Sequence, residues 1–110
     1  MKKLLLTLLV ILLPIVAKSD ESGMCGDNVT YTFEESTGTL IISGTGAIKD
    51  FMTTADCPWW NYKDNILKLV INPGIEVIGA YSFMDCTNLT TIVFSDDIKS
   101  IGAYAFSGCF

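Results

Sequence analysis

A nine-residue phrase occurs twice in this chain of 110 residues. It reads IGAYSFMDC at 78–86 and IGAYAFSGC at 101–109, and seven of twelve positions are identical over the longer windows 75–86 and 98–109. The offset of 23 residues also aligns the apolar segments upstream of the two copies. A period of roughly 20 to 50 residues is typical of solenoids, whose units bury their apolar faces against one another. The repeat therefore predicts a stacked array.

The segment upstream of each copy has the L-x-x-L-x-L spacing of a leucine-rich repeat strand. The matching inward positions are Ile66/Leu89, Leu69/Ile92 and Ile71/Phe94. Alternation along a strand sends the intervening residues to the opposite face of a parallel sheet, and solenoids use such extended faces to bind partner proteins. We expect the partner-binding face to consist of Lys68, Val70, Asn72, Thr91, Val93 and Ser95.

The doubled phrase itself is expected to form the back of each unit. Its isoleucines return apolar surface to the core, and residues 80–83 and 103–106 are expected to form short helical turns. Tyr81 and Tyr104 occupy the same repeat position. A stacked tyrosine ladder explains them at least as well as ligand binding does.

The chain before the repeats predicts a β-hairpin followed by an aromatic cluster. Residues 29–33 alternate apolar with polar side chains, 35–38 reads as a turn, and 39–43 reads as the returning strand. Residues 47–64 lack a clear period but hold much apolar surface, which we expect to close one end of the core. These residues are Phe51, Pro58, Trp59, Trp60 and Tyr62.

Trp59 and Trp60 allow two interpretations. An exposed indole can stack on a sugar ring, which would make the chain a carbohydrate-binding module. Adjacent side chains point in different directions, so at least one indole is expected in the core, and the capping role is favoured.

The phrase I-x-x-I-G-x-x-[AS]-F-x-x-C, followed by N-L-x-x-I-x-F, resembles the BspA-type leucine-rich repeats of bacterial and protist surface proteins. Segments 25–28, 39–46 and 58–60 also resemble the N-terminal part that often precedes such arrays. The resemblance implies a β-rich leucine-rich-repeat solenoid, a parallel sheet with short helical turns, preceded by an N-terminal β-hairpin cap. It implies a non-catalytic, secreted or surface-displayed module that binds extracellular or surface proteins, often in adhesion. A carbohydrate-binding or structural cell-envelope module is the alternative.

Three parts are expected along the chain: a signal peptide at 1–19, a capping region at 20–64, and about two repeat units at 65–110. The basic start and the apolar run to Ala17 are followed by small-residue cleavage candidates. This run is shorter than the roughly 20 residues of a membrane helix, which favours a cleaved signal over the alternative of an uncleaved anchor. We expect no membrane insertion after the signal is removed. A stable stack needs about three units, and the chain stops at Phe110 where another strand would begin. We therefore expect a piece of a longer array.

Charge and residue content exclude several function classes. Cleavage after Ser19 removes three of seven lysines and none of the twelve acids, which leaves a net charge of −8 without any arginine. Nucleic acids require a basic face and are therefore unexpected partners. The chain has no histidine and no recognisable nucleophile motif, so an enzyme is the least expected class and no cofactor is expected.

The four cysteines form no C-x-x-C pair, so no metal site is expected. An even count in an exported chain favours disulfides. For Cys25 and Cys57, a disulfide and two free thiols are both compatible with the sequence. Cys86 and Cys109 are equivalent repeat positions about 4.8 Å apart. This spacing permits a disulfide, but neighbours in register favour a structural ladder of buried thiols.

Two segments, Asn28-Val29-Thr30 and Asn88-Leu89-Thr90, match the N-glycosylation pattern. Asn88 repeats Asn65, which lacks that pattern. A structural role before the strand is the simpler interpretation of Asn88.

Overall fold

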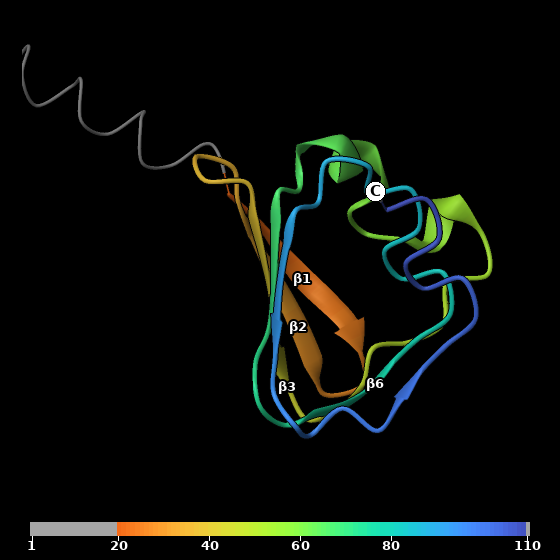
Figure 1. The fold of residues 1–110 in the computed structure, drawn as a ribbon. Coiled ribbons are helices and arrows are strands. Elements are labelled where there is room, and N and C mark those ends of the chain that lie inside the picture. Colours follow the sequence, from red (N-terminus) through yellow and green to blue (C-terminus); the bar gives the residue numbers. More distant parts are fainter. Residues whose placement is uncertain (1–19, 110) are drawn as a thin grey trace, which may run out of the picture.

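The structure is a computed structural model that describes residues 20–109, so the signal peptide expected at 1–19 lies outside the described residues. The described chain forms two sheets, connected by turns and short 3-10 helices (Figure 1). The larger sheet has the strand order β1 (Asp20–Gly26), β2 (Val29–Glu34), β3 (Thr39–Gly44), β5 (Lys68–Ile71) and β7 (Thr91–Phe94). The smaller sheet has the order β4 (Gly46–Ala47), β6 (Ile75–Ile78) and β8 (Ser100–Ile101). The 3-10 helices are η1 (Thr54–Asp56) and η2 (Trp60–Asn65).

The larger sheet is mixed, which corrects the expectation of a parallel sheet. β2 and β3 form the predicted antiparallel hairpin, whereas β3, β5 and β7 are parallel to one another. The turn between β2 and β3 places Gly38 at φ 70°, in the left-handed region that favours glycine. β1 pairs antiparallel with β2 and was not predicted, because its sequence DESGMCG lacks alternation. Pairing with the free edge of β2 satisfies its backbone groups.

Each repeat adds one strand to each sheet, so that a repeat forms one rung of a stack. Lys68 of β5 lies opposite Thr91 of β7, and Ile78 of β6 lies opposite Ile101 of β8. Side chains also form hydrogen bonds between neighbouring rungs, for example from Asn88 Nδ2 to the Asp64 carbonyl oxygen at 2.7 Å. This hydrogen bond confirms the structural role predicted for Asn88.

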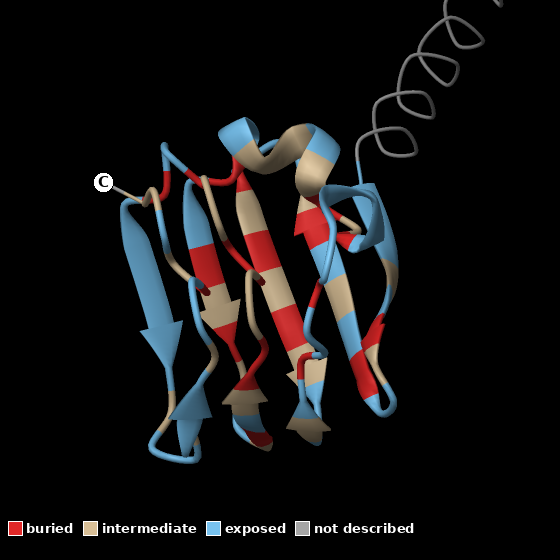
Figure 2. Cartoon of the chain, turned by 90° about the vertical axis from the view of Figure 1, so that its right-hand side faces the viewer, coloured by how far each residue is buried: buried red, intermediate tan, exposed pale blue. Residues whose placement is uncertain are grey.

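The core lies between the two sheets and the turns. The predicted inward residues Ile66, Leu69, Ile71 and Leu89 are at most 6% exposed. Ile92 and Phe94 are 40% and 52% exposed, because β7 is the edge strand and no described rung covers it. Figure 2 shows this gradient, with buried positions on β3 and β5 and none on β7.

The backs of the repeats are turns rather than the expected helical turns at 80–83 and 103–106. Tyr81 and Tyr104 have φ values of 64° and 59°. A residue in this left-handed region cannot continue a right-handed helix. The described helical segments are η1 and η2 instead, which lie in the stretch without a clear period.

The repeated glycine of the phrase is required by a close approach between backbones. A Cβ atom on Gly79 would collide with the carbonyl oxygens of Ile48 and Lys49. A Cβ atom on Gly102 would meet Ala80 N at 2.5 Å. The glycine at this repeat position therefore lets each repeat pack closely against the backbone of the preceding segment.

Candidate functional site

The outer face of the larger sheet carries the predicted partner-binding residues. Residues directly opposite one another on neighbouring strands share a face of a sheet. The pairs Thr32–Ile41, Ile41–Val70 and Val70–Val93 therefore form one row across β2, β3, β5 and β7. Val93 is 47% exposed, so the row ends on an accessible aliphatic side chain. We call this set, Thr32, Ile41, Val70 and Val93, the central row.

Polar side chains lie on both sides of the central row. One flank runs from Glu34 through Thr39 and Lys68 to Thr91, as the strand register requires. Lys68 and Thr91 are exposed and lie opposite each other. The other flank contains Thr30 and Ser43, which face each other across β2 and β3. The outer face thus has a centre that is aliphatic except for Thr32, with polar margins.

Asn72 and Ser95 differ from the other four predicted residues because they take part in the turns between strands. Asn72 Nδ2 donates to Ser43 Oγ at 2.8 Å, which links two neighbouring strands. Ser95 Oγ accepts from Asp97 N at 3.2 Å, and Asp97 Oδ2 accepts from Gly74 N at 2.9 Å. Both residues are half-buried. Lys68, Thr91 and Val93 are exposed and therefore present the more available surface, whereas Val70 is also half-buried.

The hairpin contributes residues to the face that the sequence did not point to. Thr32, Thr39 and Ile41 extend it beyond the repeats, because β3 pairs in parallel with β5. The alternation in 29–33 and 39–43 predicts which hairpin side chains point inward and which point outward. It does not predict that β3 pairs with β5, because that pairing is a long-range contact.

The four cysteines are free thiols in the structure, and a disulfide between Cys25 and Cys57 stays a prediction. Burial, reinforced by the neighbouring Cys57, raises the pKa of Cys25 to about 12. Burial raises the pKa of Cys57 to about 11. Burial and the adjacent Cys109 raise the pKa of Cys86 to about 12. Cys109 Sγ donates to the Phe83 carbonyl at 3.1 Å. Thiols with such pKa values are poor nucleophiles at neutral pH.

Trp59 belongs to the core and is unavailable to a sugar. Its side chain is 1% exposed, and its Nε1 donates to the Ser82 carbonyl at 2.7 Å. Its indole stacks on Phe83, whose ring stacks in turn on Phe106 with centroids 5.4 Å apart. Trp60 is half-buried, and Lys63 Nζ lies 4.4 Å from the centroid of its ring. The favoured interpretation, a core role for at least one indole, is confirmed.

The predicted tyrosine ladder is also confirmed. The rings of Tyr81 and Tyr104 stack with centroids 5.3 Å apart and an interplanar angle of 16°. Tyr104 is 62% exposed, so the ladder ends on an accessible ring.

Two further observations concern metals and membranes. Among residues 20–109, no three histidine, cysteine, aspartate or glutamate side chains gather closely enough to hold a metal ion. In the same part of the chain, no helix has the length and apolar character needed to cross a bilayer.

Comparison with known proteins identifies the repeats. Residues 59–110 match the family described as "BspA type Leucine rich repeat region (6 copies)". A leucine-rich repeat protein from Eubacterium ventriosum ATCC 27560, with a crystal structure at 2.50 Å resolution, has the same fold with a TM-score of 0.77 and 31% sequence identity. The match covers 83% of this chain and 24% of that chain, so this chain spans about a quarter of its relative. The search of curated proteins gives no match.

Proposed function

Because the chain belongs to the BspA-type leucine-rich repeat family, we propose that it is a non-catalytic protein-binding module that acts outside the cell. Repeats of this type generally mediate protein interactions, and the proteins that carry them are typically secreted or at the cell surface. The specific role that we propose is adhesion to proteins of host or neighbouring cells.

The observation that carries this proposal is the outer face of the larger sheet. Its aliphatic central row lies between polar margins, which is the arrangement of a protein interface with an apolar core and a polar rim. The turns and 3-10 helices lie on the other side of the core, which leaves the outer face uncovered by described elements (Figure 1). A partner could therefore contact several strands at once without displacing part of the fold.

Binding of the labelled chain to cells, measured by flow cytometry, tests this proposal. The double variant Lys68→Glu, Val93→Arg reverses one charge and places another on an aliphatic position of the face, without touching the core. We expect it to weaken binding at least about tenfold, as the loss of central interface contacts typically does. The matched control is Lys49→Glu, which makes the same charge reversal at an exposed lysine outside the larger sheet. Equal binding by both variants would remove the outer face from consideration.

A carbohydrate-binding role has one supporting observation, the half-buried Trp60 together with the exposed tyrosine ladder. Treatment of the target cells before the binding assay separates the two classes of partner. Loss of binding after protease treatment supports a protein partner. Loss of binding only after glycosidase treatment would favour the carbohydrate role.

A further inference from the structure

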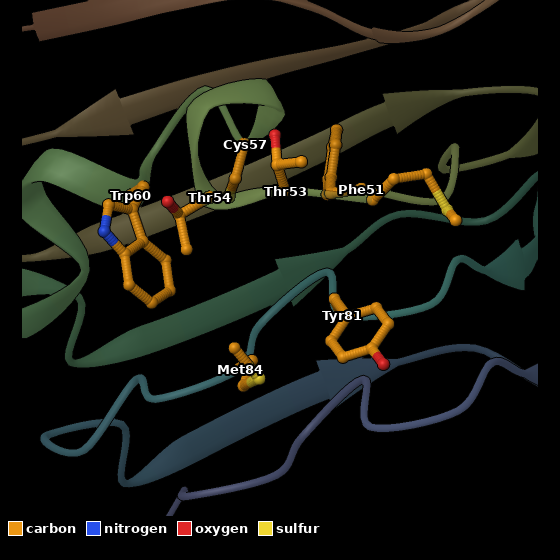
Figure 3. A pocket seen from close by; sticks show the side chains of 8 residues that line it. Phe51, Thr53, Thr54, Cys57, Trp60, Tyr81 and Met84 are labelled. Carbon is orange, nitrogen blue, oxygen red and sulfur yellow. The ribbon is translucent and has the colours of Figure 1, made fainter.

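A cavity of about 200 Å³ lies among the turns, on the side of the core away from the outer face. One wall comes from residues 51–60 and the other from the turn of the first repeat. Figure 3 shows Trp60 and Met84 toward one end of the cavity and Phe51 and Tyr81 toward the other. None of its lining residues belongs to the outer face, and one of them, Tyr81, also stacks on Tyr104 of the next rung.

The lining and the size of the cavity suit one apolar ring. Its walls are aromatic rings and methionine thioethers, with hydroxyl groups from Thr53 and Thr54 and no charged side chain. An apolar cavity of roughly 150 Å³ binds benzene, whereas drug-sized ligands occupy sites of roughly 300 to 1,000 Å³. A sugar ring needs hydrogen-bond partners for several hydroxyl groups, and charged or amide side chains do not line this cavity. The lining therefore favours an aromatic ring over a sugar.

The walls are held in place before any ligand binds. The ammonium group of Lys63 lies over the Trp60 ring at 4.4 Å from its centroid, and Phe51 is 2% exposed. Stacking on Tyr104 fixes the Tyr81 ring, and Ala80 N donates to Asp50 Oδ1 at 2.6 Å next to it. A site that is already ordered loses little conformational entropy on binding. Met52 is 76% exposed at the rim, where a flexible thioether can adapt to a ligand.

We propose that this cavity accepts one aromatic side chain of a partner protein, as an anchor site separate from the outer face. Tryptophan, tyrosine and methionine are enriched in the cores of protein interfaces, and aromatic anchors commonly fill pockets of this kind. The folded chain leaves Trp60, Tyr81 and Met84 only half-buried. An inserted ring would bury all three further.

Methionine-methyl NMR of the full chain tests the proposal, with N-acetylphenylalanine amide as the probe. We expect the probe to cause saturable shifts of the Met52 and Met84 methyl signals, because an inserted ring would lie beside both thioethers. Met24 is 57% exposed on β1, in the larger sheet and away from the cavity, so its methyl signal is the internal control and should stay unchanged. Unchanged Met84 signals up to the solubility limit of the probe would overturn the proposal. Shifts with N-acetylglucosamine in place of the aromatic amide would overturn it in favour of a sugar site.

A matched pair of variants locates the binding. Thr54→Trp adds an indole at an exposed position on the cavity wall, where it should fill the cavity and reduce the probe-induced shifts at least fivefold. Thr32→Trp makes the same change at an exposed position of the central row and should leave the shifts intact. Full shifts in Thr54→Trp, or equal losses in both variants, would contradict the cavity as the binding site. Since neither Lys68 nor Val93 lines the cavity, failure of this test leaves the proposed function of the outer face unaffected.

Discussion

The indole of Trp59 lies flat against the ring of Phe83, with centroids 5.3 Å apart and an interplanar angle of 9°. Trp59 precedes the first complete repeat, and Phe83 belongs to the turn of that repeat. The hydrogen bond from Trp59 Nε1 to the Ser82 carbonyl reinforces the same contact. The N-terminal part and the repeats are therefore joined by one buried aromatic stack, which Phe106 continues.

Trp59→Ala should destabilise the fold by about 3 to 5 kcal/mol, because it empties a fully buried aromatic site. Trp59→Phe keeps a ring on Phe83 but leaves the Ser82 carbonyl with only the Cys57 thiol as a donor, at 3.9 Å, so its loss should be smaller, about 1 to 3 kcal/mol. Urea unfolding followed by circular dichroism gives both free energies. Equal losses in the two variants would mean that the ring stack contributes little.

Gly79→Ala should destabilise the chain by about 1 to 3 kcal/mol, the usual range for overpacking, because its methyl group would collide with two backbone carbonyl oxygens. Gly23→Ala is the matched control, since its methyl group would meet the Tyr31 ring no closer than 3.1 Å and that ring can move. Thermal unfolding of the two variants checks the difference. Equal melting temperatures would show that the rungs can shift to accommodate a side chain.

Tyr104→Val should be less stable than Tyr104→Asn by about 1 to 2 kcal/mol, the penalty for a left-handed residue with a hindered side chain. Both variants lose the stacking on Tyr81, so the comparison isolates the effect of the φ value of 59°. Asparagine tolerates this conformation, whereas β-branched valine does not. Chemical unfolding of the pair measures the difference, and identical stabilities would argue against the left-handed turn.

The cysteines of the reduced protein should react with iodoacetamide in a defined order. Burial raises the pKa of all three of these thiols, to about 12 for Cys25 and Cys86, but Cys109 is only half-buried and should therefore be alkylated first. Mass spectrometry of partially alkylated samples gives the order. Early modification of Cys25 in folded protein would contradict its burial.

The same thiols make stability dependent on pH. Their folded pKa values lie above the ordinary value of 9.0, so folding favours the protonated form. The stabilisation that comes from keeping these thiols protonated in the folded state is fully present below about pH 9. It is lost as the pH rises toward 12. Urea unfolding across this range should show a decline that is smaller in Cys25→Ala than in the reduced parent chain. An identical decline in both would assign the effect to other groups.

The repeat and its strands could be predicted from the sequence because they depend on local alternation and on identity between copies. Leu69 and Ile71 are buried as their spacing indicated, and Tyr81 stacks on Tyr104 as their equivalent positions indicated. The exposed positions Lys68 and Thr91 follow from the same alternation. The binding role of these positions stays a prediction.

The other features of the fold depend on contacts between distant residues, which a local sequence pattern does not predict. Strand β1 exists because β2 offers it a free edge, and the smaller sheet joins strands of two to four residues that are too short for a detectable period. The turns at Tyr81 and Tyr104 depend on a left-handed backbone that tyrosine rarely adopts. The cavity beside Trp60 requires two distant segments to lie side by side.

The contacts between rungs have a consequence for how such a gene can change. Gly74 bonds to Asp97, Trp59 to Ser82 and Thr90 to Leu67, and every one of these pairs is separated by 23 residues. The paired repeat strands have the same spacing, since Lys68 lies opposite Thr91 and Ile78 opposite Ile101, so an in-frame duplication of 23 codons within the repeats preserves the strand register. Recombination between copies can lengthen or shorten the array by whole rungs, while an insertion of any other length within a strand shifts every later contact out of register.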